Sequence, residues 1–280
     1  MQTKPILVIG ATGKTGRRIA QKLEDGGYPV RRGSRGAEIP FDWDDPAGWP
    51  AALAGVSAAY ISYVPDLAVP QAPAAITRLV DEARQAGVKR LVLLSGRGEA
   101  NAERCEEIVR DSGIEFTLVR ASWFFQNFDE GQLLGAVLDG TIAMPAGSIR
   151  EPFIDTEDIA DVAVAALTED RHAGELYEVT GPRLMSFTDI ADEISEASGK
   201  SVQYVPVTFE QFHAALSEEA GPQLADMLTA LCREVFDGRN EHLADGVQRA
   251  LGRAPRDFSE FCRQAAASGV WNPPAEARTA

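Results

Sequence analysis

The chain of 280 residues carries a formal net charge of −15 at pH 7, with 45% hydrophobic and 25% charged residues. These totals are typical of a globular protein with a sizeable core, and so acidic a surface argues against nucleic acid as a partner, because a phosphate backbone repels it. No apolar run reaches the length of a bilayer span and the N-terminus lacks the features of a signal peptide, so we expect a cytoplasmic protein that does not associate with membranes.

The first half of the chain alternates short apolar runs with helical stretches. We expect strands over residues 5–10, 28–34, 37–43, 57–64, 89–95 and 115–120. Helices are expected over residues 14–25, from Pro70 to Gly87, and over 101–112. Strand and helix alternation of this kind is typical of a parallel sheet with right-handed crossovers.

The second half becomes mostly helical. A helix over residues 155–170 and a strand over 174–182 are followed, after Met185, by four helical stretches with one strand-like run at 202–207. The predicted fold class is therefore α/β: a Rossmann-type doubly wound parallel sheet in residues 1–182, with a smaller, mostly helical substrate-binding region in residues 183–280. Part of residues 121–155 is expected to contribute to the substrate side.

A glycine-rich turn, "GATGKTG" over residues 10–16, lies between the first strand and the first helix. In such a turn Gly10 permits the tight bend, Gly13 lets backbone amides approach a pyrophosphate, and Gly16 lets helix and strand pack closely. The helix N-terminus then presents amides and partial positive charge to phosphate groups. A mononucleotide phosphate loop is excluded, because it would need a glycine where Val8 stands. The turn predicts a dinucleotide site.

The end of the second strand indicates which dinucleotide is bound. It reads "RRGSRG", with Arg31, Arg32, Ser34 and Arg35 and no acid. A site for NAD carries an Asp or Glu here to hold the ribose 2′-hydroxyl, whereas guanidinium groups suit a 2′-phosphate. The sequence therefore favours NADP(H), with a solvated strand end as the alternative.

Six motifs in order, namely "GATGKTG", the basic "SR", "FDWDD", "GVKRLVLLS", "EFTLVRASWFFQNF" and "PFIDTEDIADVAVAAL", resemble the NmrA-like atypical short-chain dehydrogenase/reductases. The resemblance covers nearly the whole chain, and it is strongest to the branch that contains the clavine dehydrogenases of ergot alkaloid synthesis. The family implies a Rossmann-type fold and NADP(H) as the cofactor. Members commonly have a Pro after the Arg that closes the strand at 115–120, where this chain has Ala121.

The resemblance also assigns roles to individual residues. It implies that the phosphates are held by Gly10, Thr12, Gly13, Lys14, Thr15 and Gly16. It places Ser34 and Arg35 on the 2′-phosphate, and Asp42 and Trp43 beside the adenine. The residues implied along the nicotinamide ribose are Tyr63, Val64 and Ser95, and those implied at the entrance between cofactor and substrate are Trp123, Phe124 and Asn127.

One expected feature is missing. A reductase of this build usually has a Tyr and a Lys soon after the serine, to donate a proton to a developing oxyanion, but no Tyr and no Lys occurs between Ser95 and Trp123. The charged residues there, including Glu103, Arg104 and Glu106, are interpreted as the solvated face of a helix. Ser95 and Tyr63 are the candidate catalytic residues, since Tyr60 is expected to point into the core.

Three functions remain open. The protein could deliver hydride to an imine, enone or quinone-like substrate that needs little acid from the protein; Tyr63 could supply the proton from another direction; or the protein could be a non-catalytic regulator that senses NADP(H). The first is favoured, with a small apolar or heteroaromatic substrate, because Trp123 and Phe124 follow a strand end. Phe128 is expected in the core, and the oligomeric state is open, a homodimer being one alternative.

The histidines and cysteines are not expected to take part in chemistry. His172, His213 and His242 lack companions at ligand or triad spacing. Cys105, Cys232 and Cys262 are far apart and lack metal-ligand spacing, so we expect buried thiols and no metal site.

Overall fold

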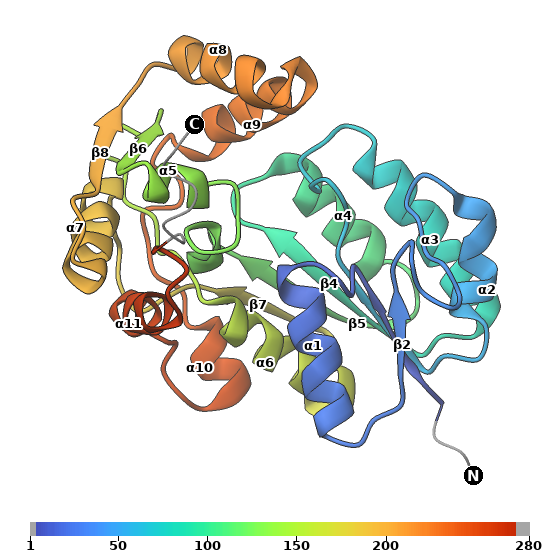
Figure 1. Cartoon of the computed structure of the whole chain (residues 1–280). Helices are drawn as coiled ribbons and strands as arrows, with labels where there is room; N and C mark the ends of the chain where they lie inside the picture. The colour runs from blue at the N-terminus through green and yellow to red at the C-terminus, as the bar shows by residue number, and fades with distance from the viewer. Residues whose placement is uncertain (1–3, 273–280) are drawn as a thin grey trace. The chain divides into compact units, whose positions relative to one another are not determined.

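The computed structural model describes residues 4–272, which separate into two compact units (Figure 1). Unit 1 consists of residues 4–121, 156–179 and 244–254, and unit 2 of residues 122–155, 180–243 and 255–272. Each unit is described by itself. The assignment of residues 183–280 as a substrate-binding region stays a prediction.

Unit 1 contains a six-stranded, wholly parallel sheet. In spatial order the strands are β2 (Val30–Gly33), β1 (Ile6–Ile9), β3 (Ala58–Ile61), β4 (Arg90–Gly96), β5 (Glu115–Ala121) and β7 (Glu175–Val179). The chain leaves β1 toward one edge and returns to its other side at β3. Ligands of open α/β sheets bind at the carboxyl ends of strands at such a switch point, here β1 and β3.

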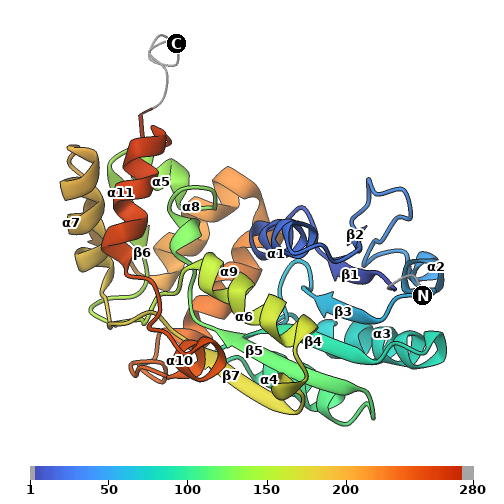
Figure 2. The same cartoon turned by 90° about the horizontal axis from the view of Figure 1, so that it is seen from below.

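Helices cover both faces of this sheet, so the predicted doubly wound fold is confirmed (Figure 2). One face carries α1 (Lys14–Asp25) and α6 (Thr156–Thr168), which pack side by side. The other face carries α2 (Trp49–Leu53), α3 (Ala72–Ala86) and α4 (Ala100–Arg110). The short helix α10 (Gly246–Leu251) packs against α6 and β7, and the single turns η1 (Pro46–Gly48) and η3 (Asp170–His172) complete the unit.

The apolar spacing of the sequence explains these helices. In α1 the residues Ile19, Ala20 and Leu23 share one face and are fully buried. The helix α3 ends at Gly87, which adopts a left-handed conformation with φ of 75°. Glycine reaches this conformation without strain, and it is a common helix end.

The predicted third strand over residues 37–43 is wrong. These residues form a loop, in which the amides of Ala37 and Phe41 both donate to the carbonyl of Ser34. The apolar residues that suggested a strand contribute to a local aromatic cluster instead. The Phe41 ring stacks on the Trp49 ring, with ring centroids 5.7 Å apart. Pro40 has no N–H to offer a neighbouring strand, which also disfavours a sheet position.

Unit 2 is mostly helical, as predicted for most of its length. It contains η2 (Phe125–Asn127), α5 (Leu134–Leu138), α7 (Phe187–Ser198), α8 (Phe209–Ala220), α9 (Pro222–Val235) and α11 (Phe258–Ser268). Two strands that pair in parallel, β6 (Thr141–Met144) and β8 (Gln203–Pro206), form a small ribbon. Ser186 and Thr208 begin α7 and α8 with capping boxes, each accepting from the amide three residues on.

The core of unit 2 is built from aromatic rings. Phe187, which is 1% exposed, lies at its centre. Its ring centroid lies 5.5 to 6.4 Å from the rings of Trp123, Phe128, Phe153, Tyr204 and Phe236. Phe128 is fully buried, which confirms its predicted place in the core. These rings come from segments far apart in the chain.

Two further expectations concern the whole described chain. Among residues 4–272 no helix is long and apolar enough to cross a bilayer. Cys105, Cys232 and Cys262 are buried thiols without a disulfide, as predicted. Burial raises the pKa of Cys105 and of Cys232 to about 12.

Candidate functional site

The turn after β1 is shaped by three glycines. Gly10 has φ of 76°, donates its N–H to the carbonyl of Gly33, and accepts from the amide of Gly13. A Cβ at Gly16 would lie far inside van der Waals contact with the Gly10 carbonyl. The first turn of α1 therefore rests directly on the end of β1, a closeness that only glycine at position 16 permits.

The start of α1 is open to an anion. Gly13 is its N-cap, and within the described chain no side chain caps it. Thr12 and Gly13 are exposed, and Lys14 is half-buried. Amides at a helix start attract negative charge, and the missing side-chain cap leaves room for a phosphate beside them.

Thr15 differs from its neighbours in the turn. Its side chain is 4% exposed and accepts a hydrogen bond of 2.9 Å from the Tyr60 hydroxyl. Tyr60 is fully buried, as predicted, and burial raises the pKa of its hydroxyl. The Thr15 side chain thus serves the core, and its backbone amide is the part that lies in the turn.

The three arginines at the end of β2 differ in whether their side chains have hydrogen-bond partners within residues 4–272. Arg31 donates to backbone carbonyls of α2 and the residue after it, and Arg32 pairs with both carboxylate oxygens of Glu24 at 2.9 and 2.7 Å. Arg35 is exposed and makes no hydrogen bond or ion pair among residues 4–272. Of the three guanidinium groups, Arg35 alone is available to a ligand, with Ser34 beside it.

The loop after β2 is fastened to the end of β3 by Trp43. Its indole N–H donates to the Ser62 carbonyl at 3.1 Å, and its ring packs edge-to-face against the Tyr63 ring with centroids 4.7 Å apart. Asp42 uses its carbonyl to accept from the Trp49 indole and its carboxylate to accept from the Asp44 amide. Asp42 and Trp43 thus lie in one ordered loop beside the switch point.

Tyr63 and Val64 follow β3 directly. The Tyr63 side chain is half-buried, and burial, aided by the nearby Asp44 carboxylate, raises the pKa of its hydroxyl. The phenol is therefore protonated at neutral pH and can donate a proton. Val64 is 60% exposed, unusual for so apolar a side chain.

The sequence pattern did not single out Ser62, although it connects the turn to the loop. A Cβ at Gly10 would lie 3.2 Å from the Ser62 Cβ, and the Ser62 carbonyl accepts from Trp43. The available signal is a small residue directly after a buried strand, at a position where the backbones of two strand ends approach each other.

Ser95 lies near the end of β4, beside Arg120 of β5. It is 4% exposed, and among the described residues its hydroxyl has no hydrogen-bond partner. A buried hydroxyl without a partner is uncommon in folded proteins, and a catalytic or ligand-binding role is one explanation for it. The structure thus leaves the predicted catalytic serine unsatisfied.

The assignment of Glu106 to a solvated helix face is wrong. Glu106 is 1% exposed, and both of its carboxylate oxygens accept from the Arg120 guanidinium, at 2.9 and 2.5 Å. Its helical neighbours Glu103 and Arg104 are exposed, as expected. The pair joins α4 to β5, so neither group serves as a substitute for the missing Tyr and Lys.

The predicted substrate-side residues belong to unit 2. Trp123 is half-buried and stacks on Phe236, with ring centroids 5.0 Å apart. Phe124 is half-buried and forms an isolated bridge with Ile154, and Asn127 is 7% exposed within η2. Trp123 and Phe124 follow the last residue of β5 after one intervening residue, as the sequence predicted.

The histidines have separate surroundings. His172 is fully buried, with Nδ1 2.8 Å from the Tyr177 hydroxyl, and burial lowers its pKa. His213 pairs with Asp226 at 2.7 Å, and His242 is exposed. The part of the chain that the structure describes holds no group of three metal-ligating side chains.

Comparisons with known proteins identify the relatives of this chain. The model of the NmrA-like family matches residues 2–262. An NAD(P)H azoreductase of Xenophilus azovorans is 32% identical, over 94% of this chain and 98% of its own length, and the agroclavine dehydrogenase of Claviceps fusiformis is 31% identical, over 91% and 95%. In fold, the chain is similar to the triphenylmethane reductase of a Citrobacter species, solved with NADP(H), with a TM-score of 0.74 and 24% identity over 93% of this chain and 99% of the other.

Proposed function

Because the chain belongs to the NmrA-like family, we propose that it is an NADPH-dependent oxidoreductase that reduces a small imine, enone or quinone-like substrate. Two relatives at or above 31% identity over nearly their whole length bear the names of an azoreductase and a dehydrogenase. The observation that carries the proposal is the glycine turn at the switch point, where the uncapped start of α1 rests on the end of β1. Bound there, the cofactor would supply the hydride.

The residues present fit a pyrophosphate. The amides at the start of α1, the exposed Thr12 and the half-buried Lys14 supply donors and positive charge. A Cβ at Gly13 would lie 3.3 Å from the Gly10 carbonyl oxygen. Glycine at this position therefore lets a pyrophosphate approach the backbone of the turn closely.

The choice of NADPH over NADH rests on Arg35. Arg31 and Arg32 already have partners, while Arg35 has none among residues 4–272, and Ser34 offers a hydroxyl beside it. A guanidinium without a partner at the end of β2 matches a 2′-phosphate in both charge and hydrogen-bond geometry. Asp42 and Trp43 would border the adenine.

For the proton we propose Tyr63, with Ser95 orienting the reacting group. Tyr63 is half-buried and protonated, and the Ser95 hydroxyl is buried without a partner in the described chain. An iminium carbon already bears positive charge and becomes a neutral amine on reduction, so such a substrate needs no strong acid from the protein. A substrate of this kind suits a chain that lacks Tyr and Lys between Ser95 and Trp123.

On the substrate side we propose Trp123, Phe124 and Asn127. The two aromatic side chains are half-buried, which gives an apolar lining with exposed ring area, and Asn127 adds an amide for orientation. A small, apolar or heteroaromatic partner follows from this lining. A cytoplasmic location and a homodimer stay predictions.

Steady-state oxidation of NADPH against a panel of cyclic imines, enones, quinones and carbonyls tests the reaction. We expect turnover on an imine or quinone and little on simple ketones, because ketones need the absent Tyr and Lys. Tight NADPH binding without turnover on any of them would instead favour a regulator that senses NADP(H).

Calorimetry with both coenzymes tests the cofactor. Arg35→Ala should weaken NADPH binding by about tenfold to a hundredfold, as expected for the loss of a charge-assisted contact, and leave NADH binding within about twofold. Arg110→Ala on α4 is the matched control, since Arg110 is also exposed and its side chain has no hydrogen-bond or ion-pair partner among residues 4–272. An equal loss in both variants would refute the 2′-phosphate site.

Tyr63→Phe tests the proton source. If Tyr63 donates, the variant should lose about a hundredfold in kcat, with the loss greatest at high pH, where water supplies protons least readily. Unchanged turnover across pH would show that Tyr63 is not the proton donor. In the proposed imine reduction the proton would then come from water.

A further inference from the structure

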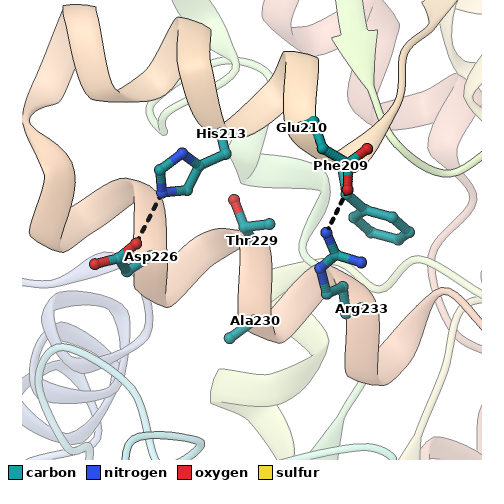
Figure 3. Close-up of a pocket in the computed structure, with 7 residues that line it drawn as sticks. All are labelled: Phe209, Glu210, His213, Asp226, Thr229, Ala230 and Arg233. Carbon is teal, nitrogen blue, oxygen red and sulfur yellow. Dashed lines mark hydrogen bonds and ion pairs between the residues drawn. The ribbon is translucent and has the colours of Figure 1, made fainter.

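A cavity of about 380 Å³ lies between α8 and α9 in unit 2, and none of its lining residues has a role in the proposed reaction (Figure 3). Its lining comes from α8 through Phe209, Glu210 and His213, and from α9 through Asp226, Thr229, Ala230 and Arg233. The four α9 residues are spaced at i, i+3, i+4 and i+7, so they share one helix face. We call this cavity the α8–α9 groove.

Each end of the groove holds a pair of oppositely charged or hydrogen-bonded side chains. At one end His213 pairs with Asp226 at 2.7 Å, and at the other Arg233 donates to Glu210 at 2.8 Å (Figure 3). Thr229 and Ala230 lie between these pairs, and the Arg233 guanidinium lies over the Phe209 ring at 4.4 Å. A volume of this size accommodates a small aromatic molecule.

The Thr229 hydroxyl lacks a hydrogen bond that helical threonines usually make. Thr229 is 6% exposed, and its oxygen has no partner among residues 4–272. Thr77 and Thr168, in other helices, each donate to the carbonyl four residues earlier at 2.8 Å. In Figure 3 the Thr229 oxygen points across the groove toward α8. Its hydrogen-bonding capacity is therefore left for something that enters the groove.

The Arg233 guanidinium has the second unused hydrogen-bonding capacity in the groove. A guanidinium has five N–H donors, and the structure engages one of them, with Glu210. The Glu210 side chain is 76% exposed, so this ion pair is weak and an incoming anion could replace it. His213, by contrast, has Asp226 on one ring nitrogen and Ser217 within 3.5 Å of the other. The Thr229 hydroxyl and the Arg233 guanidinium thus both have unused donor capacity, which suits a carboxylate on an apolar body.

From these contacts we propose that the α8–α9 groove binds a small aromatic carboxylate, held by Arg233 and the Thr229 hydroxyl with its ring against Ala230 and Phe209. Entry requires α8 to shift slightly, because the Thr229 oxygen is covered. The helix α8 can do so, since none of its described side chains is fully buried. The groove is formed by residues of unit 2, whereas the proposed cofactor turn belongs to unit 1.

Fluorine NMR with 4-fluorobenzoate as the probe tests this site on the full chain. We expect binding with Kd of about 1 mM, as is usual for so small a ligand. Arg233→Met should weaken it by at least about tenfold, and Thr229→Val, which keeps the side-chain shape, by about threefold to tenfold. Arg239→Met is the matched control, because Arg239 also pairs with a neighbouring acid in unit 2 but lies outside the groove; it should bind as the wild type does.

Three outcomes would overturn the proposal. The first is the absence of binding up to about 20 mM, well above the Kd expected for a ligand of this size. The second is an equal loss in the Arg233 and Arg239 variants, which would show attraction to arginine charge in general. The third is tighter binding of 4-fluorobenzylamine, which has the same shape and the opposite charge. Thr229→Val removes a hydroxyl without a partner and should fold normally, so its result stands even if Arg233→Met is unstable.

Discussion

The interiors of the two units are packed in different ways. In unit 1 the sheet brings backbone close to backbone, as where Gly16 rests on the Gly10 carbonyl, and its buried residues are mainly aliphatic. In unit 2 the core is a set of aromatic rings around Phe187, gathered from segments that begin at Trp123 and end at Trp271. A parallel sheet repeats one local pattern, whereas an aromatic core depends on side chains that meet only after the chain has folded.

This difference predicts where each unit is most sensitive. Unit 1 should tolerate changes of side-chain shape on its surface but not an added Cβ at its closest backbone approach. Unit 2 should respond most to the loss of a central ring. Four substitutions test this contrast, given from the largest expected effect to the smallest.

Phe187→Ala should lower the free energy of unfolding by about 4 kcal/mol, because it removes a buried ring and leaves a cavity among five others. Urea unfolding measures the change. Leu243→Ala is the control in the same unit, where the side chain is 49% exposed, and it should cost less than about 0.5 kcal/mol. Similar losses in both variants would show that the aromatic core is not the main source of stability in unit 2.

Gly16→Ala should cost about 3 kcal/mol, because the new methyl group forces α1 away from the end of β1. It should also weaken NADPH binding by about a hundredfold, since the helix start moves with it. Gly135→Ala in α5 is the matched control: a Cβ there meets nothing within 4 Å, and alanine favours a helix. A Gly16 variant as stable as the Gly135 variant would contradict the contrast between the units.

Arg120→Met should destabilise unit 1 by about 3 kcal/mol, because the Glu106 carboxylate stays buried without its partner. The double variant Glu106→Leu with Arg120→Met should recover most of that loss, since an apolar pair of similar size removes the buried charge. Thermal unfolding of both variants distinguishes the cases. A double variant no more stable than the single one would mean that the pair contributes more than mutual neutralisation.

Asp257→Asn should cost about 1 kcal/mol at neutral pH. The hydrogen bonds from Arg183 lower the pKa of Asp257 to about 2, but both side chains are more than a third exposed, so the full linkage energy is reduced by solvent screening. The contribution of a carboxylate with a lowered pKa is present above its unfolded value of about 3.8 and is lost as the pH falls through about 2.

The gap between wild type and the Asn variant should therefore close between pH 4 and pH 2, as followed by unfolding temperature. Asparagine keeps the oxygen that accepts from the Ser259 amide at the start of α11, so the helix cap is not lost with the charge. A gap that is constant over this range would show that the ion pair contributes nothing.

The sheet of unit 1 and the glycine turn were predictable because their signals are local. Apolar runs predicted all five strands that precede β6, and the helix over residues 14–25 has the predicted bounds. The failures came from contacts across the sequence. Glu106 looks like one more charge on a solvated helix until Arg120, 14 residues later, is placed beside it on β5. Phe41 looks like part of a strand until it stacks on Trp49.

The sequence indicated which residues form the candidate site. It did not indicate which of their side chains already bind other parts of the protein. The sequence marked three arginines at the end of β2 without distinguishing them, because their separation depends on which acceptors α1 and α2 bring near. It also could not show that Thr15 faces the core, since the Tyr60 hydroxyl reaches it from another strand. The helix α5 and the strand β6 were missed because they are only five and four residues long and lack a clear period.

The three thiols have a consequence for the proposed chemistry. Quinones and enones are electrophiles that alkylate cysteine through its thiolate. In this protein Cys105, Cys232 and Cys262 are all enclosed, and burial raises the pKa of each, so almost none of their sulfur is ionised at neutral pH. A reductase with this arrangement can meet reactive substrates over many turnovers without being inactivated by them.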